Sequence, residues 1–157
     1  MKQSKSLPEQ DYLRRVSVRL MLPEERERFD GLLESRHYLH SARVGGPSLR
    51  YVAEVDGQWV ALLVFSGAAP HTKAREGEIG WTPRQRARRL CFVINNSRFL
   101  VLPERQRYPN LASRVLGLCL KRVNADWQEH WGHPVVLVES YVDESQYRGI
   151  NLKAWLA

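Results

Sequence analysis

The hydrophobic and polar positions of the first forty residues predict a strand followed by a helix. Residues 15–21 alternate between polar and apolar side chains, which is typical of a strand with one buried face. Pro23 comes next, with Glu24 and Glu25 directly after it. A proline at the first helical position and carboxylates in the first turn favour a helix, which we expect to run to about Tyr38.

The clearest local pattern is a β-hairpin. Residues 49–55 and 58–65 form two apolar-rich runs on either side of Asp56 and Gly57. Asp-Gly is the dipeptide that a tight type I′ turn requires, because both central residues take positive φ angles. The second run is apolar almost throughout, which predicts a strand that is buried on both faces.

A short helix and an interrupted strand are expected next. Residues 66–80 have the composition of a loop, and Thr82 and Pro83 then supply a helix start. Residues 90–102 read as a strand whose apolar run is broken by the polar residues 95–97, where we expect a bulge or a turn.

The longest helical pattern follows Asn110, a good N-cap, and ends at Gly132. Trp127 and Trp131 lie four residues apart on it, which favours packing in the core or at the helix end. Residues 134–142 predict a buried strand, and residues 144–155 a final helix.

This order of elements predicts an α/β (α+β) fold with a mixed, mostly antiparallel sheet flanked by helices. Such a sheet would normally gain one or two more strands after the last helix, so we expect its last strands to be missing. We predict a flexible N-terminus over residues 1–11 and a single domain over residues 12–157.

The composition shows a positive net charge and allows a prediction of where the protein is located. The chain has 24 Lys and Arg residues against 17 Asp and Glu residues, a net charge of +7. That excess favours nucleic acid or an acidic cofactor as a partner, although it also serves simple solubility. Cys91 and Cys119 lie in apolar surroundings, which predicts two buried thiols. Without a signal-peptide pattern or a long apolar run, we expect a cytoplasmic protein with no membrane partner.

Basic and aromatic residues outline one candidate site. Four arginines lie between residues 84 and 89, close to a tryptophan, and this combination suits contacts with nucleic acid. A solvated helix face explains the arginines equally well. Polar residues within the strand over 90–102 could bind a phosphate or a base edge, or could satisfy a turn. The nucleic-acid-binding candidates are Trp81, Arg84, Arg86, Arg88, Arg89, Asn96 and Arg98.

A second candidate site lies at the start of the long helix. The first N–H groups of a helix lack intrahelical acceptors, and the helix dipole places positive charge there, so this end can hold an anion. The residues that would hold a phosphate-bearing cofactor are Arg107, Asn110, Leu111, Ala112 and Ser113.

A third candidate is catalytic. Glu139 lies in an apolar strand, where desolvation would raise the pKa of its carboxyl group and suit it to act as a general base. The alternative is a structural carboxylate paired with an arginine such as Arg98 or Arg148. Tyr141, on the same strand, is the other catalytic candidate. The five histidines show no metal-ligand spacing, so no metal site is predicted.

Two family resemblances add expectations about function. The element order and the loop from Arg107 to Ala112 resemble the GNAT (N-acetyltransferase) fold, in which a Gln/Arg-x-x-Gly-x-Gly/Ala loop holds the pyrophosphate of an acyl-coenzyme A. Asn110 stands where that family has its central glycine. Leu152 stands where many acetyltransferases have a tyrosine that protonates the departing thiolate, so this sequence departs from the pattern twice.

A more specific resemblance covers about residues 45–155. The chain is similar there to the DruA-type family, named for a component of the Druantia anti-phage system, whose members also occur beside or fused to transposases. The motifs that carry the resemblance are Ile79-Gly80-Trp81, residues 95–103, residues 110–113, Asp126-Trp127, residues 139–143 and Tyr147-Arg148-Gly149.

Two functions therefore stay open, beside the plainer possibility of a small interaction subunit with an inert pocket. The first is a DruA-like module that acts with nucleic acid in anti-phage defence or in a mobile element. The second is an acyl-coenzyme A-dependent N-acyltransferase that uses the Arg107–Ala112 loop for pyrophosphate and Glu139 as base, with acetyl-coenzyme A or another acyl-coenzyme A as cofactor. An exposed sheet edge near the C-terminus would favour a protein partner or a homodimer.

Overall fold

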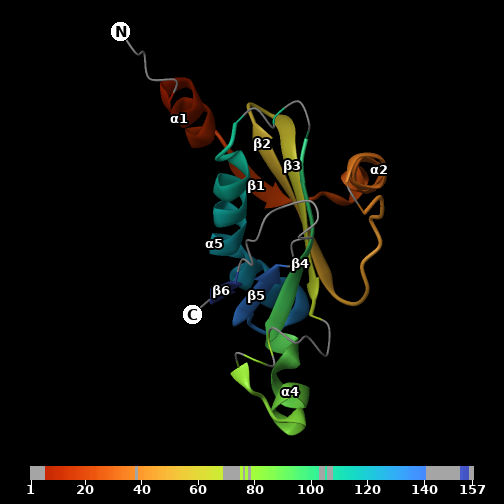
Figure 1. Cartoon of the computed structure of the whole chain (residues 1–157). Coiled ribbons are helices and arrows are strands. Elements are labelled where there is room, and N and C mark those ends of the chain that lie inside the picture. Colours follow the sequence, from red (N-terminus) through yellow and green to blue (C-terminus); the bar gives the residue numbers. More distant parts are fainter. Residues whose placement is uncertain are drawn as a thin grey trace. The chain divides into compact units, whose positions relative to one another are not determined.

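The fold is α+β, and its sheet is mixed. A computed structural model describes residues 6–37, 39–68, 75, 77, 79–102, 105, 108–140 and 153–155 (Figure 1). The elements in chain order are α1 (Ser6–Arg14), β1 (Ser17–Leu20), the 3-10 turn η1 (Pro23–Glu25), α2 (Arg26–Arg36), β2 (Ser48–Val55), β3 (Gln58–Gly67), α4 (Pro83–Arg89), the 3-10 turn η2 (Leu90–Phe92), β4 (Val93–Val101), α5 (Leu111–Trp131), β5 (Leu137–Ser140) and β6 (Lys153–Trp155).

The strands follow one another across the sheet in the order β1-β2-β3-β4-β5-β6. β1 pairs with β2 and β5 pairs with β6 in antiparallel fashion, whereas β4 and β5 run parallel. The predicted α+β class and mixed, mostly antiparallel sheet are therefore confirmed. Its likeness to the GNAT fold stays a prediction.

The chain divides into two compact units, which are described in turn. The first unit comprises Met1–Arg43, Leu49–Val64 and Arg98–Arg122. The second comprises Val44–Ser48, Phe65–Ser97 and Val123–Ala157.

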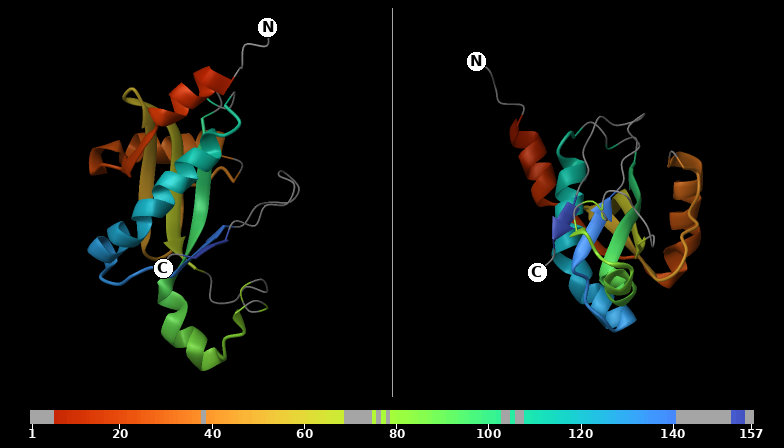
Figure 2. Two further views of the ribbon diagram at one scale, coloured as in Figure 1. Left: turned by 90° about the vertical axis from the view of Figure 1, so that its left-hand side faces the viewer. Right: turned by 60° about the horizontal axis from the view of Figure 1, so that its bottom comes forward.

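The hairpin at the centre of the first unit forms as predicted. Asp56 and Gly57 have φ angles of 52° and 77°, which are the positive values that a type I′ turn needs. Residues 59–64 of β3 are all buried, as expected for a strand that is covered on both faces. In this unit α2 lies on one side of the hairpin, and α1 and the first part of α5 lie on the other (Figure 2).

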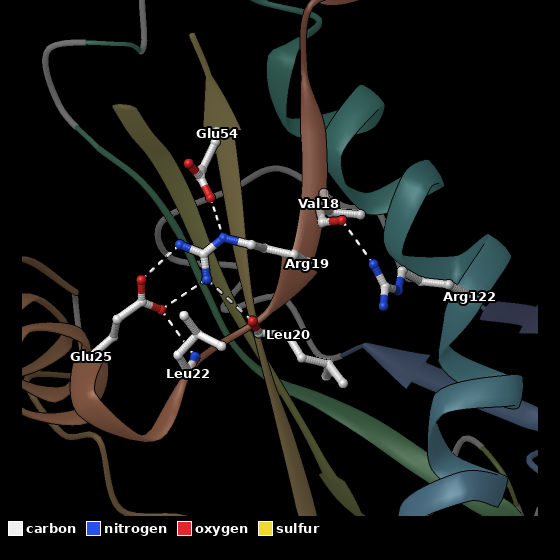
Figure 3. A network of polar contacts seen from close by, with 7 residues as sticks. All are labelled: Val18, Arg19, Leu20, Leu22, Glu25, Glu54 and Arg122. Atoms are coloured by element: carbon white, nitrogen blue, oxygen red, sulfur yellow. Dashed lines mark hydrogen bonds and ion pairs between the residues drawn. The ribbon is translucent and has the colours of Figure 1, made fainter. Parts of the chain in front are cut away.

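An arginine network ties β1 to its neighbours in the first unit (Figure 3). Arg19 donates to Glu54 on β2 and makes two hydrogen bonds, of 2.8 and 2.7 Å, to the carboxylate of Glu25 in η1. The hydrogen bond to Glu25 is the main cause of a raised pKa at Arg19, and Arg19 in turn lowers the pKa of Glu25. Arg122 of α5 donates to the carbonyl oxygen of Val18, 2.9 Å away. These arginines are committed to holding the fold.

The second unit departs from three expectations. β4 runs from Val93 to Val101 without a turn at residues 95–97, and its residues Val93–Asn96 pair in regular register with residues 137–140 of β5. The bulge that was the other expectation stays a prediction. The expected final helix is wrong where the chain is described, since Lys153–Trp155 form strand β6 beside β5. Arg75, Gly77 and Ile79 are helical, although residues 66–80 were expected to be a loop.

Three further observations concern exposure and helix limits. Cys119 is buried as predicted, but Cys91 is exposed because it lies in η2 at the surface. Trp127 is buried, whereas Trp131 is 45% exposed. α1 begins at Ser6, within the stretch that was expected to be flexible. No described helix combines the length and the apolar character that a membrane span requires.

Candidate functional site

The arginine-rich helix α4 forms because its start is fully capped. The hydroxyl of Thr82 accepts a hydrogen bond from the backbone N–H of Gln85 (3.2 Å), and the Gln85 side chain accepts one from the N–H of Thr82 (3.0 Å). Pro83 occupies the first turn. This reciprocal capping box fixes a helix of only seven residues that has little apolar surface to bury.

The arginines of α4 are available to solvent. Arg84, Arg88 and Arg89 are exposed, and Arg86 is half-buried. Within the part of the chain that the structure describes, no carboxylate forms an ion pair with Arg84, Arg88 or Arg89. Two views of the second unit show α4 extending away from β5 and β6 (Figures 1 and 2). At these three arginines the helix therefore presents positive charge that no carboxylate of the described residues neutralises through an ion pair.

The sequence around α4 holds no acidic residue for some distance. Between Glu78 and Glu104 there is no Asp or Glu, while the same stretch has the four arginines of α4 and Arg98. Trp81, directly before the Thr82 cap, is half-buried. The predicted combination of an aromatic residue and arginines is thus placed on and just before one exposed helix.

Asn96 and Arg98, the other two residues predicted to contact nucleic acid, are already engaged within the fold. Asn96 is buried, with 8% exposure, and lies opposite Ser140 in the β4–β5 register. Arg98 belongs to the first unit, where it donates to the carbonyl oxygens of Ser41 (2.7 Å) and Arg43 (3.0 Å). Arg98 therefore holds the chain segment before β2, and a contact of either residue with nucleic acid stays a prediction.

The amino end of α5 already has an anion of the chain itself beside it. Glu9 of α1 accepts a hydrogen bond from the backbone N–H of Asn110, with 3.1 Å between the nitrogen and the carboxylate oxygen. The ring of Tyr12, also on α1, stacks on the ring of Tyr108 with centroids 4.1 Å apart. A carboxylate near a helix N-terminus is stabilised by the helix dipole. Glu9 therefore already occupies one N–H donor that an external anion would use.

The other residues predicted for a cofactor are placed unevenly. Leu111 is fully buried, Ala112 is half-buried and Ser113 is exposed. Arg107, the first residue of the predicted pyrophosphate loop, lies outside the described residues. The structure thus brings Asn110 to Ser113 together at the helix start and leaves the role of Arg107 as a prediction.

Glu139 is a buried carboxylate held by a buried arginine. Glu139 and Arg75 are 3% and 2% exposed, and they form a two-pronged ion pair with N–O distances of 2.6 and 3.1 Å. The sequence had suggested an arginine such as Arg98 or Arg148 as the partner. The structure pairs Glu139 with Arg75, a residue from a stretch expected to be a loop, and Arg148 lies outside the described residues. Nothing in the sequence pattern marked Arg75. Tyr141 lies outside the described residues.

A further polar atom lies one strand away from this ion pair. Asn95 of β4 is opposite Glu139 of β5 in the strand register. Its side-chain oxygen Oδ1 is buried and has no hydrogen-bond partner among the described residues. Both oxygens of the Glu139 carboxylate are held by the guanidinium of Arg75, so the pair is better suited to support the fold than to act as a base.

His37 is the buried histidine of the first unit. It is 2% exposed, and its Nδ1 accepts a hydrogen bond from the backbone N–H of Leu39 at 3.1 Å. Burial, followed by the positive charge of Arg98, lowers the pKa of His37 to about 4. Among the described residues, no three His, Cys, Asp or Glu side chains gather as a metal site would require.

Comparison with known proteins identifies the family. No curated protein matches the chain. Residues 3–152, nearly its whole length, match the family described as Druantia protein DruA. The motifs quoted above from residues 79–149 lie inside this match. The chain therefore belongs to the DruA family.

Proposed function

We propose that this DruA-family protein acts with nucleic acid and that the arginines of α4 make the contact. Membership of the family implies a role in the Druantia system of anti-phage defence. The observation that carries the proposal is the exposure of Arg84, Arg88 and Arg89 without an ion-pair partner among the described residues.

Unpaired arginine is well suited to a phosphate backbone. The guanidinium group presents several N–H donors in a planar fork that matches two phosphate oxygens. Each phosphate that an arginine neutralises also releases condensed counterions, which makes binding favourable at low salt. An arginine already paired with a carboxylate offers less, because the internal pair must first be broken. Arg19, held by Glu25 and Glu54, is an example.

The contact is expected to be independent of sequence. α4 has seven residues, and phosphate contacts position a protein on nucleic acid without reading bases. A helix of two turns with arginines at residues 84, 86, 88 and 89 is long enough to follow neighbouring phosphates but offers few side chains for base edges. We therefore expect α4 to contact the sugar-phosphate backbone of the nucleic acid.

Fluorescence anisotropy with labelled 20-nucleotide single strands, 20-base-pair duplexes and RNA tests the proposal. The variant Arg84→Ala/Arg88→Ala removes two exposed arginines from one helical face. The matched control, Arg14→Ala/Lys121→Ala, removes two exposed positive charges from α1 and α5, so both variants lower the net charge by the same amount. We expect Arg84→Ala/Arg88→Ala to bind more weakly than the wild-type protein, and the control variant to bind about as well as the wild-type protein. No binding by the wild-type protein at 50 mM salt contradicts the proposal.

The acyltransferase alternative has less support. Its loop N–H at Asn110 is bonded to Glu9, and its general base Glu139 is bonded to Arg75. Thermal melting with millimolar acetyl-coenzyme A is expected to show no stabilisation, because a ligand that binds the folded state raises the melting temperature. The predicted protein partner or homodimer, through the edge that β6 gives to the sheet, likewise awaits a measurement of mass in solution.

A further inference from the structure

The second unit carries an exposed aromatic surface at the end of α5. We define it by Phe92, Trp131, His133 and Val136. Trp131 and Val136 are 45% and 43% exposed, and Phe92 and His133 are half-buried. Exposed apolar side chains that gather on one surface can mark an interaction site, and tryptophan is among the residues enriched at the centres of such sites.

The rings of this surface are arranged around a rigid base. Trp127, which is buried, has its ring centroid 6.2 Å from that of Trp131 and 6.4 Å from that of His133. The indole N–H of Trp127 donates to Nε2 of His133 at 3.4 Å, and the ring of Phe92 meets His133 edge-on at 5.9 Å. Gly132, with a φ angle of 79°, reverses the chain between Trp131 and His133. The surface is therefore pre-organised.

The aromatic surface is directly linked to the arginine helix. Phe92 is the last residue of η2, the three-residue turn that follows α4. Its carbonyl oxygen accepts a hydrogen bond from the backbone N–H of Val136, 2.8 Å away. Arg88 and Arg89 thus stand three or four residues from Phe92 in the same unit, with no acidic residue between them.

We propose that this surface stacks unpaired bases, so that the protein prefers single-stranded nucleic acid to a duplex. This inference rests on the proposed function. Arginines on α4 would hold the backbone while Trp131 receives a base, the combination by which proteins bind single strands without reading sequence. In a duplex the bases are already stacked on each other and cannot reach a side chain at the surface. The uniformly basic stretch before Phe92 favours a polyanion over a protein partner.

The test compares one variant on two ligands. Trp131→Ala is expected to weaken binding of a labelled thymidine 20-mer by about fivefold to a hundredfold, the range for removing one stacking aromatic. Its affinity for a 20-base-pair duplex should change less than twofold. Trp131→Phe keeps a ring and should restore most of the affinity. The matched control is Leu22→Ala, which removes a similarly exposed apolar residue, 47% exposed, from the first unit. Circular dichroism melting of each variant checks that it is folded.

The outcomes separate this inference from the proposal on which it rests. If Arg84→Ala/Arg88→Ala weakens binding but Trp131→Ala leaves the thymidine 20-mer unaffected, stacking is refuted and the α4 contact stands. Equal losses on strand and duplex also refute stacking. If wild-type protein is a dimer by light scattering and Trp131→Ala is a monomer with unchanged 20-mer affinity, the surface binds protein instead. Loss on the single strand alone, with rescue by phenylalanine, supports the inference.

Discussion

The salt dependence of binding gives the sharpest prediction for α4. The variant Arg84→Ala/Arg88→Ala removes two exposed side chains that lie four residues apart. At 1.5 Å of rise per residue their Cα atoms are about 6 Å apart along the helix axis. That is close to twice the axial spacing of ~3.4 Å between phosphates on one strand of B-DNA. The two arginines can therefore contact two phosphates of the same strand.

The magnitude follows from counterion release. Each phosphate contact contributes about 0.9 to the slope of log affinity against log salt on duplex DNA. Two lost contacts should lower the slope by about 1.8, which corresponds to an affinity loss of about sixtyfold at 0.1 M salt relative to 1 M. The variant and the wild-type protein should thus bind almost equally at high salt and diverge as salt is removed.

Anisotropy titrations of a labelled 20-base-pair duplex between 0.05 and 0.4 M salt measure the slope. The control Arg14→Ala/Lys121→Ala should keep the wild-type slope to within one contact, because its two residues lie on other helices. An equal drop in slope for both variants would show that binding follows net charge alone. The assignment of the contact to α4 would then be wrong.

Three further predictions concern stability. Gly57→Ala should lower the free energy of unfolding in urea by about 1–2 kcal/mol, because its φ of 77° strains a residue with a side chain even though no atom lies near the new methyl group. Gly31→Ala in α2, a helical position that also has open space, should raise that free energy by about 0.5–1 kcal/mol. Arg75→Met should cost about 3–5 kcal/mol by taking the arginine away from the buried Glu139 carboxylate, and adding Glu139→Leu should recover most of that loss in the same assay. The pKa of His37 is lowered to about 4, so the unfolded chain takes up a proton at a higher pH than the folded chain does. The free energy of unfolding should therefore be at its full value above pH 6.5 and fall by up to about 3 kcal/mol as the pH falls to 4. Thermal melts of His37→Asn should show a flatter pH dependence.

Local chemistry explains why the hairpin and the capped start of α4 were predictable. Asp56 and Gly57 dictate a turn through their own backbone preferences, and Thr82 and Pro83 dictate the start of α4 in the same way. Such signals involve residues within four positions of one another, so they can be recognised from the sequence without knowing the fold. The α+β class then follows from the order of these elements, because short connections limit how strands can pair.

Contacts between distant parts of the chain were not predictable. Arg75 and Glu139 are 64 residues apart, and each is an ordinary charged residue in its own neighbourhood. Only the fold shows that both are buried and that they face one another. The same holds for β6, where a polar stretch suggested a helix. Pairing with residues 137–139 of β5 outweighed the local preference of Lys153–Trp155.

The candidate site was predicted in part for the same reason. The sequence offered two electropositive features, the amino end of α5 and the arginines of α4, and could not say which of them the fold would neutralise. The structure supplies a carboxylate at the first, Glu9, from 101 residues away. It supplies none to Arg84, Arg88 and Arg89 among the described residues. A polyanion gains most where positive charge has no internal partner, so α4 is the place to look for the nucleic acid.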